Sequence, residues 1–223
     1  FGGTITPTRV TCTEEYDGAT WSAGGAMITA REYIGGAGTQ NAGAVFGGAE
    51  PSVSNKTEEY DGSSWSAGGN LITARDGGST YGGTQNAAIY AGGCDPSGVA
   101  CTEEYDGSSW SAGGNMIQGR QYLAGFGTQN AHLVYGGYVS PAETKLTEEY
   151  NGSSWTVGGN LLIAVRHTAG SGTQNDGMTF AGFPTQTNTQ NYNGIGWSTG
   201  TNMIAPRFGH GGVGTSTSAL AFT

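Results

Sequence analysis

The chain has 223 residues, a formal net charge of −9 and only 11% charged residues. With eight lysines and arginines in total, it is a poor candidate for binding nucleic acid through the phosphate backbone. It contains no apolar run of about 18 residues or more, so membrane insertion is not expected. The 43 glycines approach low-complexity composition, but five regularly spaced tryptophans indicate order, because disordered segments are poor in aromatic residues.

One nine-residue segment, TEEYDGSSW, recurs along the chain with small changes. Every copy ends in a tryptophan, and these tryptophans are 44, 45, 45 and 42 residues apart. A repeat in the forties is typical of propeller blades, although helical arrays share this period. The copies end at Trp21, Trp65, Trp110, Trp155 and Trp197.

The pattern between the tryptophans favours strands over helices. The longest glycine-free runs, residues 4–17 and 138–151, are fourteen residues long, and each contains a proline. Interior glycine and proline cost a helix roughly 1 and 3 kcal/mol, so long helices have almost no place to form. EEYDGSSW instead predicts a hairpin with a two-residue Asp-Gly turn, and GGTQNAAIYAGG predicts a second hairpin around residues 84–86. Each unit thus supplies four strands, and the predicted fold class is all-β.

The repeated residues resemble the kelch motif. In three units an apolar strand ends in Gly-Gly, a tyrosine follows, a tryptophan stands five residues later, and an arginine ten or eleven residues after that. The clearest set is Gly92-Gly93, Tyr105, Trp110 and Arg120. This resemblance covers essentially the whole chain and implies a β-propeller of four-stranded antiparallel blades. The chain departs from the family in having only five units and in Gly182-Phe183, which replaces one double glycine.

Five blades are expected, and one of them is shared between the two ends of the chain. Residues 215–223 can supply the second strand of a blade whose outer strands lie at 12–23, and residues 1–3 continue that strand. Such closure removes exposed sheet edges. The chain is then one domain, with repeat units at 1–30 plus 207–223, 31–74, 75–119, 120–165 and 166–206.

We favour structural interpretations of the repeated aromatic and acidic residues. The tyrosines and tryptophans are expected to pack between neighbouring blades, and a row of sugar platforms is the alternative. Paired glutamates occupy adjacent strand positions and face opposite sides, so a pair cannot form one catalytic dyad. A solvated or arginine-paired face is therefore favoured. The pairs lie at 14–15, 58–59, 103–104 and 148–149.

Five of the eight basic residues recur once per unit, at the start of the predicted innermost strand. There they would form a ring at one mouth of the axial channel. Pairing with glutamate or with backbone carbonyls is favoured, and an anion-binding ring is the alternative, because guanidinium suits carboxylates and phosphates. The ring consists of Arg31, Arg75, Arg120, Arg166 and Arg207.

Signals for catalysis, cofactors or metals are weak. The three histidines occupy non-equivalent positions in different units, and no nucleophile, phosphate-loop or zinc motif is present. We therefore expect neither an enzyme nor a cofactor or metal site. Cys94 and Cys101 bracket a short loop and could form a disulfide in an oxidising compartment, which the sequence leaves open.

The connections between the second and third strands of each unit differ completely, whereas the other turns are nearly fixed. They read TITPTRVT, AEPSVSNK, CDPSGVAC, YVSPAETK and FPTQTN in chain order. In a propeller these connections emerge on one face, a layout suited to recognition, although exposed loops also vary without function. The candidate binding residues on this face are Glu50, Asn55, Asp95, Tyr138, Glu143 and Phe183.

This layout favours a non-catalytic binding or structural module at a virus-particle or cell surface. The Gly-, Ser-, Thr- and Asn-rich units resemble the repeats of marine phage structural and tail-associated proteins. That resemblance of style implies an extracellular or virion-associated role, attachment to a host-surface glycan or protein, and assembly with other virion or fibre subunits. The alternatives are a multivalent lectin with one equivalent sugar site per blade and a kelch-type platform for protein interaction.

Overall fold

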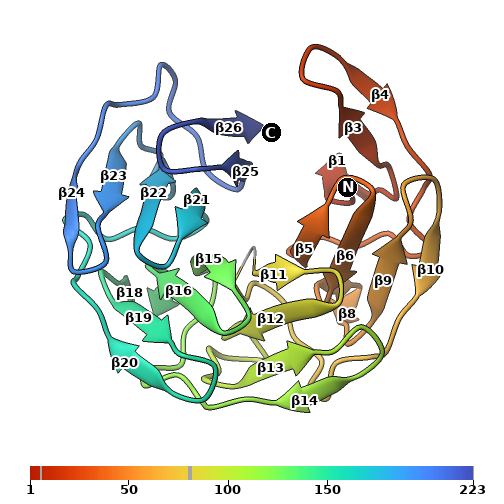
Figure 1. Cartoon of the computed structure of the whole chain (residues 1–223), viewed down its shortest axis with the longest axis horizontal. Coiled ribbons are helices and arrows are strands. Elements are labelled where there is room, and N and C mark those ends of the chain that lie inside the picture. Colours follow the sequence, from red (N-terminus) through yellow and green to blue (C-terminus); the bar gives the residue numbers. More distant parts are fainter. Residues whose placement is uncertain (6, 80–81, 223) are drawn as a thin grey trace.

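The computed structural model describes residues 1–5, 7–79 and 82–222. All the regular elements found in these residues are β-strands. The described part of the chain accordingly provides no helix with the length and hydropathy to cross a membrane. Figure 1 shows four-stranded sheets arranged as blades around a central axis, and all of their strand pairs are antiparallel. The prediction of an all-β propeller with four-stranded antiparallel blades is confirmed.

Four blades are complete in the described residues. From the axis outward, the first contains β5 (Gly35–Thr39), β6 (Ala42–Phe46), β9 (Thr57–Tyr60) and β10 (Trp65–Ala67). The second contains β11 (Gly83–Thr84), β12 (Ala87–Ala91), β13 (Thr102–Tyr105) and β14 (Trp110–Ala112). The third contains β15 (Ala124–Thr128), β16 (Ala131–Tyr135), β19 (Thr147–Tyr150) and β20 (Trp155–Val157). The fourth contains β21 (Ala169–Thr173), β22 (Asp176–Phe180), β23 (Thr189–Tyr192) and β24 (Trp197–Thr199).

The predicted fifth blade is divided into two half blades on either side of an opening in the ring (Figure 1). One half blade consists of β3 (Glu14–Tyr16) and β4 (Trp21–Ala23), and the other of β25 (Gly211–Gly214) and β26 (Ala219–Phe222). The prediction of five complete blades is therefore wrong for this structure, because β3 and β26 form no ladder within the described residues. A physical reason is that Phe1 packs against Trp65, the position that the end of β26 would need.

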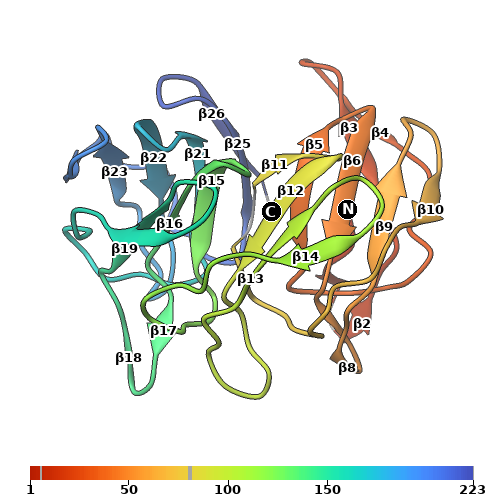
Figure 2. The ribbon, with the colours of Figure 1, turned by 60° about the horizontal axis from the view of Figure 1, so that its bottom comes forward.

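Three small hairpins project from one side of the ring, the loop face, which Figure 2 shows at the bottom. They are formed by the variable connections that follow the second strand of a blade. These hairpins are β1 (Thr4–Ile5) with β2 (Thr8–Arg9), β7 (Ala49–Glu50) with β8 (Ser52–Val53), and β17 (Tyr138–Val139) with β18 (Ala142–Glu143).

The hydrophobic core is distributed between neighbouring blades. The second strand of each blade is the most buried, because both of its faces are covered, and Val45 and Phe46 on β6 are fully buried. Phe46 packs against Tyr90 and Trp110 of the next blade, with ring centroids 5.1 and 4.9 Å apart. Four of the five tryptophans are buried in this way between neighbouring blades, as the favoured interpretation predicts, whereas Trp21 is exposed at the opening.

The Asp-Gly turns differ from the predicted two-residue turn. Tyr60 pairs with Trp65, so four residues connect the strands. Asp61 Oδ1 accepts hydrogen bonds from the backbone amides of Ser63 and Ser64, each at 2.8 Å, which is an Asx turn. These bonds and that of the Ser63 hydroxyl lower the pKa of Asp61 to about 2. Gly62 has a positive φ of 92°, which glycine adopts without steric cost.

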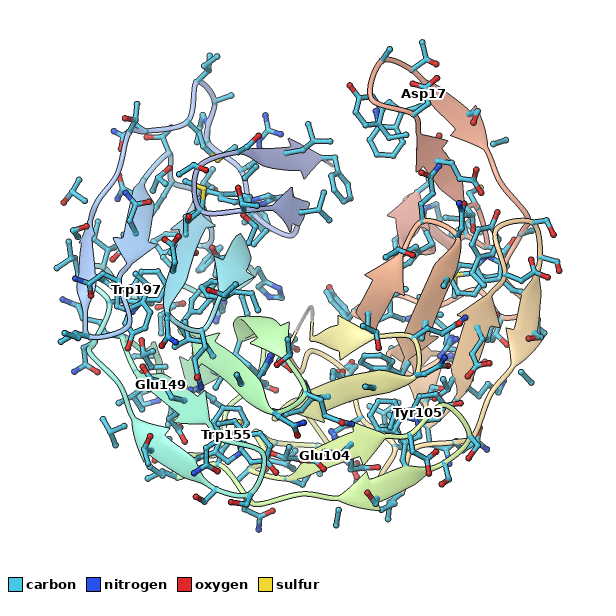
Figure 3. The ribbon with its side chains drawn as sticks, viewed as in Figure 1. Asp17, Glu104, Tyr105, Glu149, Trp155 and Trp197 are labelled. Carbon is cyan, nitrogen blue, oxygen red and sulfur yellow. The ribbon has the colours of Figure 1, made fainter. Side chains whose placement is uncertain are left out.

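Two side-chain hydrogen bonds repeat at each interface between successive units. Trp110 Nε1 donates to Thr57 Oγ1 of the preceding blade at 2.9 Å, and Tyr105 Oη donates to Glu59 at 2.6 Å. Figure 3 labels Glu104 and Glu149, which accept the equivalent hydrogen bonds from Tyr150 and Tyr192 further along the ring. The equivalent pairs are Trp65–Thr13, Trp155–Thr102, Trp197–Thr147, Tyr60–Glu15, Tyr150–Glu104 and Tyr192–Glu149.

Candidate functional site

Three of the five predicted ring arginines are structural. Arg31, Arg75 and Arg120 are 0% exposed, and each pairs with the first glutamate of the next TEEY strand. The Arg31–Glu58 and Arg120–Glu148 pairs have nitrogen–oxygen distances of 2.8 and 2.9 Å, and Arg75 pairs with Glu103 in the same way. These three side chains agree with the favoured pairing interpretation and do not present guanidinium groups to solvent.

The fourth unit departs from this pattern by one residue. Gly137 N donates to Val165 O, just as Gly93 N donates to Arg120 O, so the residue equivalent to Arg120 is Val165. The sequence-based placement of Arg166 in the ring is therefore wrong, and Arg166 occupies the next position along. Arg207 does hold the equivalent position, because Gly182 N donates to its carbonyl, and its side chain is half-buried.

Arg166 instead lies at the centre of a cluster on the loop face. Its guanidinium carbon is 4.9 Å from the ring centroid of Tyr138 and 4.3 Å from that of Phe183. Its Nη1 lies 3.3 Å from Glu143 Oε1. Cation–π contacts of this kind contribute about 0.5–1 kcal/mol at exposed sites. The structure thus brings together three of the six candidate binding residues around a residue that had been assigned to a different site.

The other three candidates are separated from this cluster. Glu50 forms an ion pair with Lys56 at 2.9 Å, which together with the Ser54 hydroxyl lowers the pKa of Glu50 despite the opposing effect of burial. Asn55 Nδ2 donates to Leu71 O at 3.4 Å, which indicates a structural role. Asp95 is exposed in the loop between Cys94 and Cys101, whose thiols are free and not bridged.

A second feature of the loop face lies at the axis, where five equivalent residues, one per unit, follow the arginine position by two. Their backbones form a chain of hydrogen bonds around the axis: Tyr33 O accepts from Gly77 N at 3.1 Å, Gly77 O from Tyr122 N at 2.6 Å, and Tyr122 O from His167 N at 3.0 Å. His167 O then accepts from Gly209 N at 2.8 Å. We call these five residues the axial ring.

All five residues of the axial ring have left-handed backbone conformations. The φ values of Gly77 and Gly209 are 57° and 66°, whereas those of Tyr33, Tyr122 and His167 are 55°, 58° and 48°. A left-handed conformation costs a residue with a side chain on the order of 1 kcal/mol relative to glycine. Three units therefore carry an aromatic side chain at a position where glycine is less strained.

The aromatic side chains of the axial ring contact one another across the axis. Tyr122 and His167 are stacked with ring centroids 4.3 Å apart, and Tyr33 lies 6.0 and 5.9 Å from them. Burial and the neighbouring Arg166 lower the pKa of His167 to about 4, so this imidazole is neutral at neutral pH. The sequence analysis missed this cluster. Its only signal is that the two residues ending in the axial-ring position differ in every unit: EY (32–33), DG (76–77), QY (121–122), RH (166–167) and FG (208–209).

Polar side chains stand beside the axial ring, one position earlier in four of the five units. Glu32 is held by Arg9 at 2.6 Å. Asp76 and Gln121 form no side-chain hydrogen bond within the described residues, and one oxygen of each is buried without a partner. Desolvation, and secondarily the charge of Glu32, raises the pKa of Asp76. These groups differ from unit to unit, so the face is asymmetric.

A cleft of about 520 Å³ lies at the opposite end of the inner strands. Its walls include Trp21 and Phe222 on the two sides of the opening, the turn at 38–40, and glycines of the inner strands. The cleft is lined mostly by backbone and apolar side chains. It extends from the inner strands into the opening between the two half blades. The described residues include no group of three or more His, Cys, Asp or Glu side chains placed to hold a metal.

Comparisons with known proteins add no relative. No protein-family model matches the chain, and no curated protein matches it.

Proposed function

We propose that this chain is a non-catalytic binding module that attaches a virus particle or cell surface to a host-surface glycan through the loop face. The observation that carries the proposal is the clustering of Arg166 with Tyr138, Glu143 and Phe183 on the face where the units differ most. Aromatic rings next to charged hydrogen-bonding groups suit sugars, which have both apolar and hydroxyl-bearing surfaces.

The differences between units support one asymmetric site over a lectin with five equivalent sites. The five residues that precede the axial ring carry an acid, an amide, a base or an aromatic ring, although the first four of them are equivalent in backbone pairing. A site copied in every blade would need the same side chains in every blade. These residues are Glu32, Asp76, Gln121, Arg166 and Phe208.

The test is binding of the purified chain to an array of neutral, sialylated and sulfated glycans. Tyr138→Ala/Phe183→Ala removes both rings that flank Arg166 and is expected to abolish binding. Ser63→Ala, in a turn at the opposite end of the blade, is the matched control and should bind normally. Binding unaffected by the double substitution would contradict the loop-face proposal, and no binding to any glycan would favour a protein partner instead.

We also propose that the propeller closes as five blades, with β3 and β26 paired. Each half blade supplies the two strands that the other lacks. The ring centroids of Trp21 and Phe222 are 5.7 Å apart across the opening. Gly214 pairs with Ala219 as Gly38 pairs with Gly43, and Gly43 pairs with Tyr60. By equivalence, Ala219 would lie opposite Tyr16 and Ala221 opposite Glu14, and Phe222 would replace Phe1 beside Trp65.

Closure is tested by a disulfide between Glu14→Cys and Ala221→Cys, in a background with serine at residues 12, 94 and 101. An intrachain bond is expected under mild oxidation. Leu220→Cys with Glu14→Cys is the control, because a shift of one residue places the two side chains on opposite faces. A bond that forms only between two chains would indicate pairing with a second copy, and equal yields from both pairs would contradict the register.

A further inference from the structure

The three aromatic residues of the axial ring are not explained by folding. The ring needs a left-handed residue in every unit, and Gly77 and Gly209 show that glycine forms the same backbone hydrogen bonds. Tyr33, Tyr122 and His167 form them at a conformational cost that glycine avoids. Residues held in such conformations cluster at functional sites, where a required side chain offsets the strain.

The two glycines make room for the aromatic rings. A Cβ added to Gly77 would lie 2.7 Å from Cδ1 of Tyr122, so the Tyr122 ring extends over this glycine. A Cβ added to Gly209 would meet nothing within 4 Å, because Gly209 borders the opening in the ring. Tyr33 borders the cluster and is 49% exposed. The axial ring therefore forms an aromatic shelf whose solvent-exposed edge is Tyr33.

Hydrogen-bonding groups without protein partners lie beside this shelf. Asp76 immediately precedes Gly77, and Gln121 immediately precedes Tyr122; within the described residues neither side chain forms a hydrogen bond. Glu32 and Arg166, at the equivalent positions of two other units, already form ion pairs with Arg9 and Glu143. The polar capacity left for a ligand is thus one carboxylate and one amide.

We propose that the axial ring binds a single neutral pyranose residue at the end of a glycan; this inference rests on the glycan attachment proposed above. The C–H face of a pyranose would stack on Tyr33 and Tyr122, while its hydroxyls donate to the carboxylate of Asp76 and to the amide oxygen of Gln121. An acidic sugar is disfavoured, because Asp76 has no cationic partner among the described residues and the chain carries a net charge of −9.

The experiment compares Tyr33→Gly and Tyr122→Gly with the unchanged chain on methyl glycosides and neutral oligosaccharides, by array and by titration calorimetry. Each substitution is expected to weaken binding by about tenfold or more. The thermal midpoint is expected to stay the same or rise for Tyr33→Gly, because glycine relieves the strain at this exposed position. Ile195→Gly, an exposed substitution in a turn at the other end of the molecule, is the matched control and should not change binding.

Asp76→Asn provides a second readout that does not depend on the aromatic rings. It keeps the shape of the side chain and is expected to weaken neutral-sugar binding while stabilising the fold at neutral pH, where the poorly solvated carboxylate is charged.

Three outcomes would contradict the inference. Neutral-glycan binding that survives both glycine substitutions would place the sugar elsewhere on the loop face and leave the proposed function intact. Binding restricted to sialylated or sulfated glycans would contradict the neutral ligand. No binding to any glycan would overturn both the inference and the proposed function.

Discussion

The interfaces between complete blades and the opening between the half blades are built from the same repeated residues but differ in their contacts. Trp110 is 7% exposed and donates to Thr57, whereas Trp21 is 47% exposed. Tyr105 donates to Glu59 of the preceding blade, whereas Tyr16 donates to the carbonyl of Gly18 in its own turn. The repeated segment therefore connects each blade to the one before it. Its tryptophan and tyrosine stabilise the fold only where the preceding blade is present to receive their contacts.

The opening also contains the groups that a fifth interface would need. By equivalence, Tyr16 would reach Asn191, whose Oδ1 is buried without a partner, and Trp21 would reach Thr189. Asp17 marks the tip of the β3–β4 half blade beside the opening (Figure 3). The backbone chain of the axial ring likewise lacks one bond, from Tyr33 N to Gly209 O.

The largest expected effect comes from removing a tryptophan. Trp110→Ala should lower the free energy of unfolding by about 4 kcal/mol, because it creates a cavity beside Phe46 and Tyr105. Trp21→Ala should cost at least about 2 kcal/mol if the ring closes as proposed. Urea unfolding curves provide the measurement, and a cost below about 1 kcal/mol for Trp21→Ala would indicate that the opening persists in solution.

The next effect concerns the buried Arg–Glu ion pairs. Where such a pair is missing from a blade, both of its residues are replaced together. The fourth blade has Val165 and Gln190 where the third blade has Arg120 and Glu148. Glu148→Gln alone should cost about 3 kcal/mol, because it leaves a buried guanidinium without its charge partner.

Adding Arg120→Val should recover at least half of that loss, since the double variant reproduces the residues of the fourth blade. Thermal unfolding of the single and double variants measures this coupling. A double variant less stable than Glu148→Gln would show that the two pairs of residues are not interchangeable. In the proposed closed ring Glu14 would be the partner of Arg207, which is half-buried rather than fully buried, so Glu14→Gln should cost only about 1 kcal/mol.

The smallest effect concerns the tyrosine hydroxyls. Burial and the hydrogen bond to Glu59 raise the pKa of Tyr105 to about 12, compared with about 10 in an unfolded chain. This stabilisation is complete below pH 10 and is lost as the pH rises through 12, because the unfolded state ionises first.

Tyr105→Phe should cost about 1 kcal/mol at pH 7 and flatten the loss of stability between pH 10 and 12. Tyr16→Phe should cost less, since its proposed acceptor is the amide of Asn191. Denaturant unfolding at several pH values gives both numbers, and an unchanged alkaline slope in Tyr105→Phe would contradict the assignment.

Much of the fold follows from the sequence, because the period of the tryptophans and the glycine-rich turns leave few alternatives. The strands TEEY and those ending in Gly-Gly lie where the pattern predicts. The number of complete blades does not follow, because Phe1 and Phe222 both correspond to Phe46, and a pattern cannot decide which of them occupies that position.

The candidate site was only partly predictable. Tyr138, Glu143 and Phe183 were identified from loop variability. Arg166 was assigned to the wrong position because it lies only one residue after the true equivalent of Arg120, which is Val165. The axial ring was missed, because left-handed backbone at Tyr33, Tyr122 and His167 carries no sequence signal when the residue is not glycine.

The glycines of the inner strands have a consequence for the size of the ring. A Cβ on Gly170 would lie 2.0 Å from the Tyr135 hydroxyl, and one on Gly212 would lie 2.6 Å from the Phe180 ring. Each blade is therefore a wedge whose narrow end is almost bare backbone. Wedges with thin inner ends complete a circle with fewer members, so larger residues in these strands would widen the hub and leave space for additional blades.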